Sequence, residues 1–130
     1  MKKLLIVDDE ESILLCLSYA LQAEGVEVIT CSEIEQAEEA LASTHFDLVI
    51  TDIRMSGVQG VEGLELLKFI KERYTTEVIV MTGNGSAEIE KLSYELGALH
   101  FFMKPLNFQE LLLKVDAIGI PTKIKSLQVS

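Results

Sequence analysis

The sequence predicts a single α/β domain in which five parallel strands form a doubly wound sheet covered by helices on both faces. Two observations support this fold class. Short apolar runs recur without polar alternation, which is typical of strands buried on both faces. Between these runs, apolar residues recur every three to four positions, which is the spacing of a helix with one buried face. Alternating strands and helices favour a parallel sheet with right-handed crossovers.

The strands are expected where the apolar runs lie. These runs cover residues 4–7, 26–30, 48–51, 77–81 and 101–103. Four of them are followed directly by a polar residue, which is common where a strand ends in a loop.

Helices are expected between the runs and after the last one. The first should continue to about residue 23 and end before Gly25, since glycine commonly closes a helix. Capping-box patterns predict the start of the second helix at Ser32 with Glu35, and of the last at Asn107 with Glu110. The apolar faces comprise Ile13, Leu14, Leu17 and Leu21; Ile34, Ala37 and Leu41; Leu64, Leu67 and Ile70; Ile89, Leu92 and Leu96; and Phe108, Leu111, Leu112 and Val115.

Five strands connected in this way suit the flavodoxin-like (βα)5 order 2-1-3-4-5. The first and third strands are then neighbours at the topological switch point, where open α/β sheets bind ligands beyond the carboxyl ends of their strands. The first strand leads into Asp8 and Asp9, and the third leads into Asp52. The order therefore predicts three carboxylates at one crevice.

Composition restricts the class of protein. The chain has 130 residues, a formal net charge of −10 and a mean hydropathy of +0.29. The negative charge argues against direct nucleic acid binding by this domain, which would need a basic face. No apolar stretch approaches the roughly 20 residues that span a membrane, and the start does not resemble a signal peptide. We therefore expect a cytoplasmic protein that does not bind membranes.

Residues 1–118 are expected to form the domain. Residues 119–130 lose the helical periodicity and contain Pro121, so we expect a C-terminal tail or the start of a linker there.

Polar residues follow four of the five predicted strands. They are Asp8 with Asp9, Asp52, Thr82 and Lys104. Converging carboxylates repel one another unless a cation neutralises them, and Mg²⁺ prefers such oxygen ligands. A neutralised site lets one aspartate remain anionic and attack phosphorus, while an ammonium and a hydroxyl contact the phosphoryl oxygens. The pattern therefore predicts a phosphoryl-transfer site.

Each of these residues also has an ordinary structural explanation. Asp8 and Asp9 could simply begin a helix, whose N-terminus favours negative charge. Lys104 and Pro105 could be only a loop with a restricted residue before proline. The functional interpretation depends on finding all of these features at the ends of four strands of one sheet.

Four segments occur in a fixed order along the chain: Leu5-Ile6-Val7-Asp8-Asp9-Glu10, Asp47-Leu48-Val49-Ile50-Thr51-Asp52-Ile53-Arg54-Met55, Val80-Met81-Thr82-Gly83 and Phe102-Met103-Lys104-Pro105. As an ordered set they resemble the receiver domain of two-component response regulators, of the chemotaxis-receiver type. The resemblance extends from about Lys3 to Ala117.

The resemblance implies a Mg²⁺-dependent phosphoacceptor site. Asp52 would accept the phosphoryl group from a sensor histidine kinase or a phosphotransfer protein. Asp9 and Asp52 would bind Mg²⁺ directly, and Asp8 would bind it mainly through water. The backbone carbonyl of Arg54 would be the remaining ligand that the protein supplies.

The resemblance also implies a conformational switch. Thr82 and Lys104 would bind the phosphoryl oxygens, and the Lys104–Pro105 peptide bond would be cis. Thr82 would move toward the phosphoryl group, and Phe101 would fill the space that it leaves. The switch would alter the face formed by the fourth helix, fifth strand and fifth helix, which would control an output domain or partner and could also form a homodimer.

The segment 56–63 departs from the family pattern. The usual proline after Met55 is missing. Either Glu62-Gly63-Leu64 matches the family's Asp-Gly-Leu with three extra residues before it, or Gly60 is the family glycine and the helix starts late.

Arg54 and Asn84 occupy the two positions that, in this family, flank the path of the hydrolytic water. We expect Arg54 to contact the phosphoryl group and crowd that water, so that the phosphoprotein is long-lived. The alternative is an Arg54 side chain that points into solvent.

Three functions compete. The first is a signalling receiver that is not a turnover enzyme. The second is a phosphohydrolase with an aspartate nucleophile, but the Asp-x-Asp pattern of haloacid-dehalogenase-like families is absent after the first strand. The third is a degenerate receiver that only binds partners, against which the intact acidic residues, Thr82 and Lys104 argue.

Overall fold

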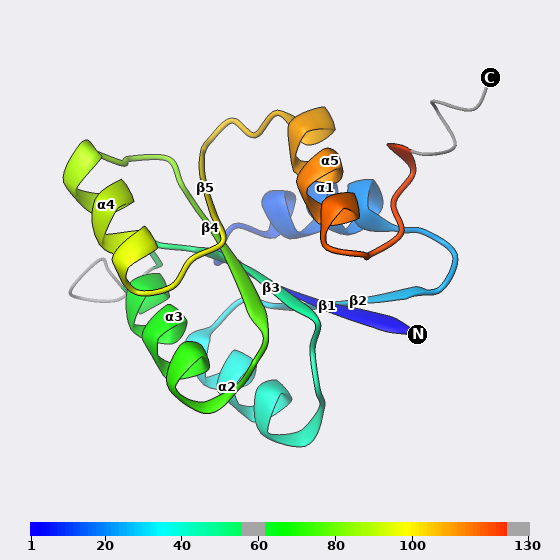
Figure 1. Cartoon of the computed structure of the whole chain (residues 1–130), viewed down its shortest axis with the longest axis horizontal. Coiled ribbons are helices and arrows are strands. Elements are labelled where there is room, and N and C mark those ends of the chain that lie inside the picture. The colour runs from blue at the N-terminus through cyan, green and yellow to red at the C-terminus, as the bar shows by residue number, and fades with distance from the viewer. Residues whose placement is uncertain (56–61, 125–130) are drawn as a thin grey trace.

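A computed structural model describes residues 1–55 and 62–124. Strands and helices alternate through this part of the chain (Figure 1). Their bounds are β1 Lys2–Val7, α1 Glu11–Leu21, β2 Val26–Cys31, α2 Ile34–Ser43, β3 Leu48–Asp52, α3 Glu62–Arg73, β4 Glu77–Thr82, α4 Ala87–Glu95, β5 His100–Met103 and α5 Phe108–Ala117.

The strands form one parallel sheet in the order β2-β1-β3-β4-β5, so the predicted fold class is confirmed. The register aligns the ends of the strands. Val7 lies opposite Thr51 on β3, and Thr82 lies opposite Met103 on β5. The residues that end or follow the strands are therefore brought to one edge of the sheet.

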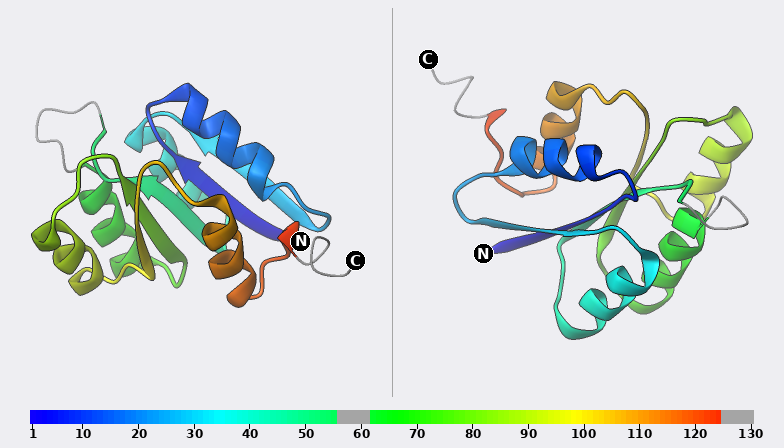
Figure 2. Two further views of the ribbon diagram at one scale, coloured as in Figure 1. Left: turned by 90° about the horizontal axis from the view of Figure 1, so that it is seen from above. Right: turned by 180° about the vertical axis from the view of Figure 1, so that it is seen from behind.

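Both faces of the sheet are covered, as the unbroken apolar runs predict. Helices α1 and α5 cover one face, and α2 and α3 cover the other, with α4 beside α3 (Figure 2). Side chains of β1 alternate between the two layers: Leu4 and Ile6 pack with α1 and α5, whereas Leu5 and Val7 pack on the opposite side. This two-sided burial explains why β1, β3 and β4 show no polar alternation, whereas the edge strand β2 contains Glu27 and Thr30 and is only partly buried.

Two helix starts differ in their agreement with the sequence prediction. The Asn107 side chain accepts a hydrogen bond from the backbone N–H of Glu110 at 3.0 Å, so the cap of α5 is confirmed. The capping box at Ser32 and Glu35 is wrong: Glu33 occupies the cap position of α2 without a side-chain bond. The Ser32 backbone N–H instead donates to the Gln36 side chain at 3.1 Å, because the helix starts one residue later than the pattern requires.

The segment after α5 returns to the core. Ile120 and Ile124 are buried in the layer that also contains α1 and α5. Lys123 Nζ donates to the backbone carbonyl of Tyr19 on α1 at 2.7 Å. The part of the expected tail up to residue 124 is therefore packed rather than frayed, and residues 125–130 lie outside the described residues.

Within the described ranges, no helix is long and apolar enough to cross a membrane.

Candidate functional site

Four strands deliver the predicted residues to the carboxyl edge of the sheet. Asp52 and Thr82 are the last residues of β3 and β4, and Asp8 and Lys104 directly follow β1 and β5. Asp8, Asp52 and Thr82 are buried. The crevice lies where β1 and β3 are adjacent, as expected at a topological switch point.

Lys104 lies among three carboxylates. Its Nζ is 2.8 Å from Asp8 Oδ2, 3.4 Å from Asp52 Oδ2 and 3.4 Å from Glu10 Oε1. The side chain of Lys104 is only 12% exposed, so water screens these pairs less than at the surface. The amino group therefore neutralises part of the negative charge of the crevice.

The two buried aspartates have raised pKa values. Burial, with the nearby charge of Asp8, raises the pKa of Asp52 to about 6, against the opposing effects of Lys104 and of the Arg54 backbone N–H. Burial also raises the pKa of Asp8, although Lys104 and the Glu10 backbone N–H stabilise its charged form. Neither carboxylate is fully compensated by the protein, which favours binding of an additional cation.

Lys104 is held in its charged form. Burial acts to lower its pKa, but the hydrogen bond to Asp8 and the charges of Asp52 and Glu10 outweigh this effect, so the pKa is raised. A permanent positive charge beside Asp52 is suited to binding an anionic group there.

The acidic residues could hold a metal ion. Asp8, Asp9 and Asp52 each offer one oxygen atom, and these atoms lie within 4.8 Å of one another. Asp9 is exposed, so solvent can reach the group from its side. Hard oxygen donors with access to water fit Mg²⁺, which usually retains several waters. Arg54 is next to this group, since its backbone N–H donates to Asp52 Oδ1 at 3.3 Å.

The predicted switch residues lie on neighbouring strands. Thr82 Oγ1 accepts a hydrogen bond from the Asn84 backbone N–H at 3.2 Å. Phe101 is half-buried on β5, and its backbone N–H donates to the Tyr94 hydroxyl at 3.2 Å. The Lys104–Pro105 peptide bond is cis.

The helix that follows the unusual segment begins at the site itself. Gly63 lies in the first turn of α3, and its N–H donates to the Ile53 carbonyl at 3.0 Å. A Cβ atom on Gly63 would collide with the backbone of Asp52 and Ile53. The close approach of α3 to the end of β3 therefore requires a glycine at position 63. Gly60 and the rest of 56–61 lie outside the described residues.

Two contacts of the site were not predicted from the sequence. Glu10 pairs with Lys104, and no role in the site was predicted for Glu10 from the sequence. The Arg54 Nε donates to the Asn84 carbonyl at 3.0 Å, which joins two loops. The sequence motifs contain Glu10 and Arg54. No local pattern could pair these residues with Lys104 and Asn84, which lie far away in the chain.

Comparison with known proteins identifies the same domain. The family model described as "Response regulator receiver domain" matches residues 4–116. The transcriptional regulatory protein PhoP of Bacillus subtilis is 32% identical over 90% of this chain, but the match covers 48% of PhoP. The chain thus spans about half the length of the first curated relatives that it matches. Sporulation initiation phosphotransferase F of Bacillus subtilis is 34% identical, with 85% of this chain and 87% of that protein covered.

Solved structures show the same architecture. The beryllofluoride-activated NtrC4 receiver domain dimer is 34% identical, with a TM-score of 0.82 over 91% of this chain and 96% of that one. The response regulator TrrA of Thermotoga maritima, solved in complex with Mg²⁺ and BeF, is 37% identical, with a TM-score of 0.77 over 91% of this chain and 99% of that one.

Proposed function

The chain belongs to the response regulator receiver domain family, and from this premise we propose that it is a phosphorylation-activated signalling receiver. Asp52 accepts a phosphoryl group from a sensor histidine kinase or phosphotransfer protein in a Mg²⁺-dependent reaction. The domain is a switch and not a turnover enzyme, since it catalyses only its own phosphorylation and slow dephosphorylation. The observation that carries the proposal is Lys104 Nζ, held between buried Asp8 and Asp52 at the carboxyl edge of the sheet.

In the proposed reaction, a carboxylate oxygen of Asp52 forms a bond to phosphorus while the bond from phosphorus to the histidine nitrogen of the donor breaks. Lys104 and the Thr82 hydroxyl bind the phosphoryl oxygens. Both act mainly through position and charge, which is most of what phosphoryl transfer requires of a protein.

A Mg²⁺ ion held by the carboxylates of the site would supply positive charge, which would lower the cost of bringing two anions together. Asp9, Asp52 and the Arg54 carbonyl would hold it directly, and Asp8 would do so mainly through water. The cluster of oxygens within 4.8 Å supports this assignment.

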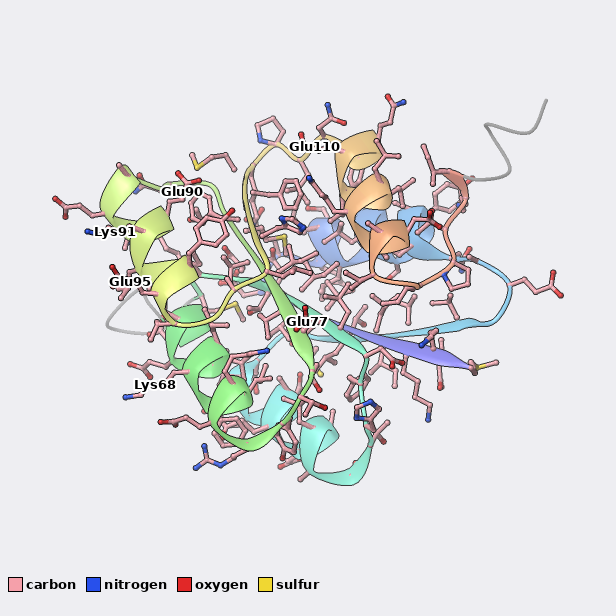
Figure 3. All side chains as sticks on the ribbon, viewed as in Figure 1. Lys68, Glu77, Glu90, Lys91, Glu95 and Glu110 are labelled. Atoms are coloured by element: carbon pink, nitrogen blue, oxygen red, sulfur yellow. The ribbon has the colours of Figure 1, made fainter. Side chains whose placement is uncertain are left out.

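The switch in this proposal uses Thr82 and Phe101 to alter the face formed by α4, β5 and α5. Lys91 and Glu95 project from the outer side of α4, and Glu110 stands at the start of α5 (Figure 3). A mixture of exposed charges and apolar side chains there suits a reversible contact with an output domain, a partner or a second copy. The NtrC4 receiver, which is similar to this chain, was solved as a dimer.

The phosphodonor would dock near α1. Exposed Leu15 and Tyr19 of α1 and Phe108 of α5 line an apolar groove of about 500 Å³ between these helices. Exposed apolar surface of this kind commonly marks a protein contact.

We further propose a cytoplasmic location and no direct binding of nucleic acid by this domain. We also propose that residues 1–118 form the receiver domain, with a C-terminal tail or linker from 119 whose first part, through Ile124, packs against the domain.

Intact mass after incubation with acetyl phosphate tests the proposed function. We expect a gain of one phosphoryl group in wild type with Mg²⁺, no gain without Mg²⁺, and no gain in Asp52→Asn. A Thr82→Ala variant should still gain the phosphoryl mass, but phosphorylation should no longer alter the face formed by α4, β5 and α5. Absence of any gain in wild type would favour a degenerate, binding-only receiver, and rapid turnover of phosphate esters would favour a phosphohydrolase.

A further inference from the structure

The side chain of Arg54 connects two loops of the site. Its Nε donates to the backbone carbonyl of Asn84 at 3.0 Å, which joins the segment after β3 to the segment after β4. Its backbone N–H donates to Asp52 Oδ1 at 3.3 Å. A single residue thus contacts both the proposed phosphoacceptor and the loop that follows Thr82.

Both polar backbone groups of Asn84 are engaged. Its carbonyl accepts the Arg54 bond, and its N–H donates to Thr82 Oγ1 at 3.2 Å. The position of the loop and the surroundings of the Thr82 hydroxyl are therefore linked. Loss of the bond from Arg54 to the Asn84 carbonyl would leave the loop held less firmly, and would thereby weaken the bond from the Asn84 N–H to Thr82.

The next residue, Gly85, lies directly against both switch side chains. A Cβ atom added there would be 2.9 Å from Phe101 Cζ and 2.9 Å from Thr82 Cγ2, which is closer than real Cβ contacts allow. The loop backbone therefore occupies the space beside the Phe101 ring. A shift of this loop must change the room available to that ring.

We propose that the Arg54–Asn84 hydrogen bond holds the loop between β4 and α4 in its resting position, and that a phosphoryl group on Asp52 releases it by drawing the guanidinium away. This inference rests on the proposed phosphorylation of Asp52. A guanidinium bonds more strongly to phosphate oxygens than to a neutral carbonyl, since both partners are then charged. In the unphosphorylated protein Arg54 acts on the loop through Asn84, as a positioning residue, and it contacts the phosphoryl group only after transfer.

Arg54→Ala tests the first half of the proposal in unphosphorylated protein without Mg²⁺. We expect amide exchange at Asn84, measured by NMR, to accelerate about three- to tenfold, as for loss of one hydrogen bond. The signals of Gly85 and Phe101 should shift toward their positions in wild type saturated with Mg²⁺ and beryllofluoride. Arg54→Lys keeps the charge but not the planar fork of donors, so it should give an intermediate effect.

Lys91→Ala is the matched control, because it removes one positive charge from an exposed site on α4. It should leave exchange at Asn84 unchanged. An unaltered thermal midpoint in Arg54→Ala would show that the effect is local.

Beryllofluoride with Mg²⁺ tests the second half. The NMR shift of the Arg54 Nε–H should change in wild type, because this donor moves from the Asn84 carbonyl to the phosphate analogue. The Asn84 N–H does not isolate this step, since its acceptor Thr82 also turns toward the phosphoryl group in the proposed switch. Equal exchange in unphosphorylated Arg54→Ala and wild type would overturn the proposal, whatever the mass measurement on Asp52 gives. An unchanged Arg54 Nε–H shift in wild type with bound beryllofluoride would overturn the release step. Failure of the proposed function would appear separately, as the absence of a phosphoryl mass gain.

Discussion

The amino nitrogen of Lys104 lies 2.8 Å from a carboxylate oxygen of Asp8, although 96 positions separate the two residues in the chain. The same nitrogen is 3.4 Å from Asp52. In the resting protein, the positive charge is therefore nearer to a proposed metal site residue than to the proposed phosphoacceptor. It is also close enough to Asp52 to contact the phosphoryl group that we propose Asp52 accepts.

Lys104→Ala should destabilise the protein without Mg²⁺ at neutral pH. It leaves Asp8 and Asp52 buried with no cationic partner, and breaking a buried pair in this way costs about 3 kcal/mol or more. Denaturant unfolding in EDTA measures the change. Lys91→Ala, whose exposed pair with Glu95 is 4.0 Å long, should change the free energy of unfolding by less than about 0.5 kcal/mol. Equal effects of the two variants would contradict this assignment.

Asp52→Asn should stabilise the protein without Mg²⁺ at pH above 7. The pKa of Asp52 is raised from 3.8 to about 6 in the folded protein, so folding favours the protonated carboxyl group. With respect to this group, the fold is therefore most stable below the unfolded pKa of 3.8, and it loses stability as the pH rises through about 6 and the buried carboxyl group becomes charged. The shift corresponds to at most about 3 kcal/mol.

The measurement is the free energy of unfolding of wild type and Asp52→Asn from pH 4 to pH 8 in EDTA. The advantage of the variant should shrink as pH falls through about 6 and vanish near the unfolded pKa of 3.8. A constant difference across this range would contradict the raised pKa.

Asp9→Ala should weaken Mg²⁺ binding by at least about tenfold, since it removes one of three oxygen donors. Because Asp9 is exposed, the fold should be little affected. Calorimetric titration with Mg²⁺ measures the affinity, and Glu39→Ala provides a control in which an exposed carboxylate is removed from α2. An unchanged affinity in Asp9→Ala would remove this residue from the metal site.

Gly63→Ala should destabilise the fold by about 2 kcal/mol or more, since its Cβ would meet the backbone of Asp52 and Ile53. Thermal and denaturant unfolding measure the loss. At Gly83 the nearest atom to an added Cβ is 3.9 Å away, so Gly83→Ala should be tolerated. Equal stability of the two variants would show that α3 can shift away from the strand end at little cost.

Arg54→Ala should shorten the lifetime of the phosphoprotein by about threefold to tenfold, if the side chain contacts the phosphoryl group and excludes water with one net hydrogen bond. Loss of the phosphoryl mass over time measures the lifetime, with Lys91→Ala as the control. An unaltered lifetime would mean that Arg54 does not restrict the hydrolytic water.

The local sequence was sufficient to predict the fold class, the strand order and the residues at the strand ends. Burial on both faces produces uninterrupted apolar runs such as Leu4–Val7. The alternation of these runs with segments of helical spacing leaves few possible topologies. Helix starts were predicted less well. The cap of α5 at Asn107 is confirmed, but the capping box of Ser32 with Glu35 is wrong, because α2 starts one residue later and the Ser32 backbone N–H bonds to Gln36 instead.

The sequence by itself determined which side chains reach the carboxyl edge of the sheet, since each follows directly from the end of its own strand. Only the tertiary structure decided how they pair. The approach of Lys104 to Asp8, of Gly63 to Ile53 and of Arg54 to Asn84 depends on distances between elements far apart in the chain. Those distances are set by the packing of helices on the sheet, which no local pattern encodes.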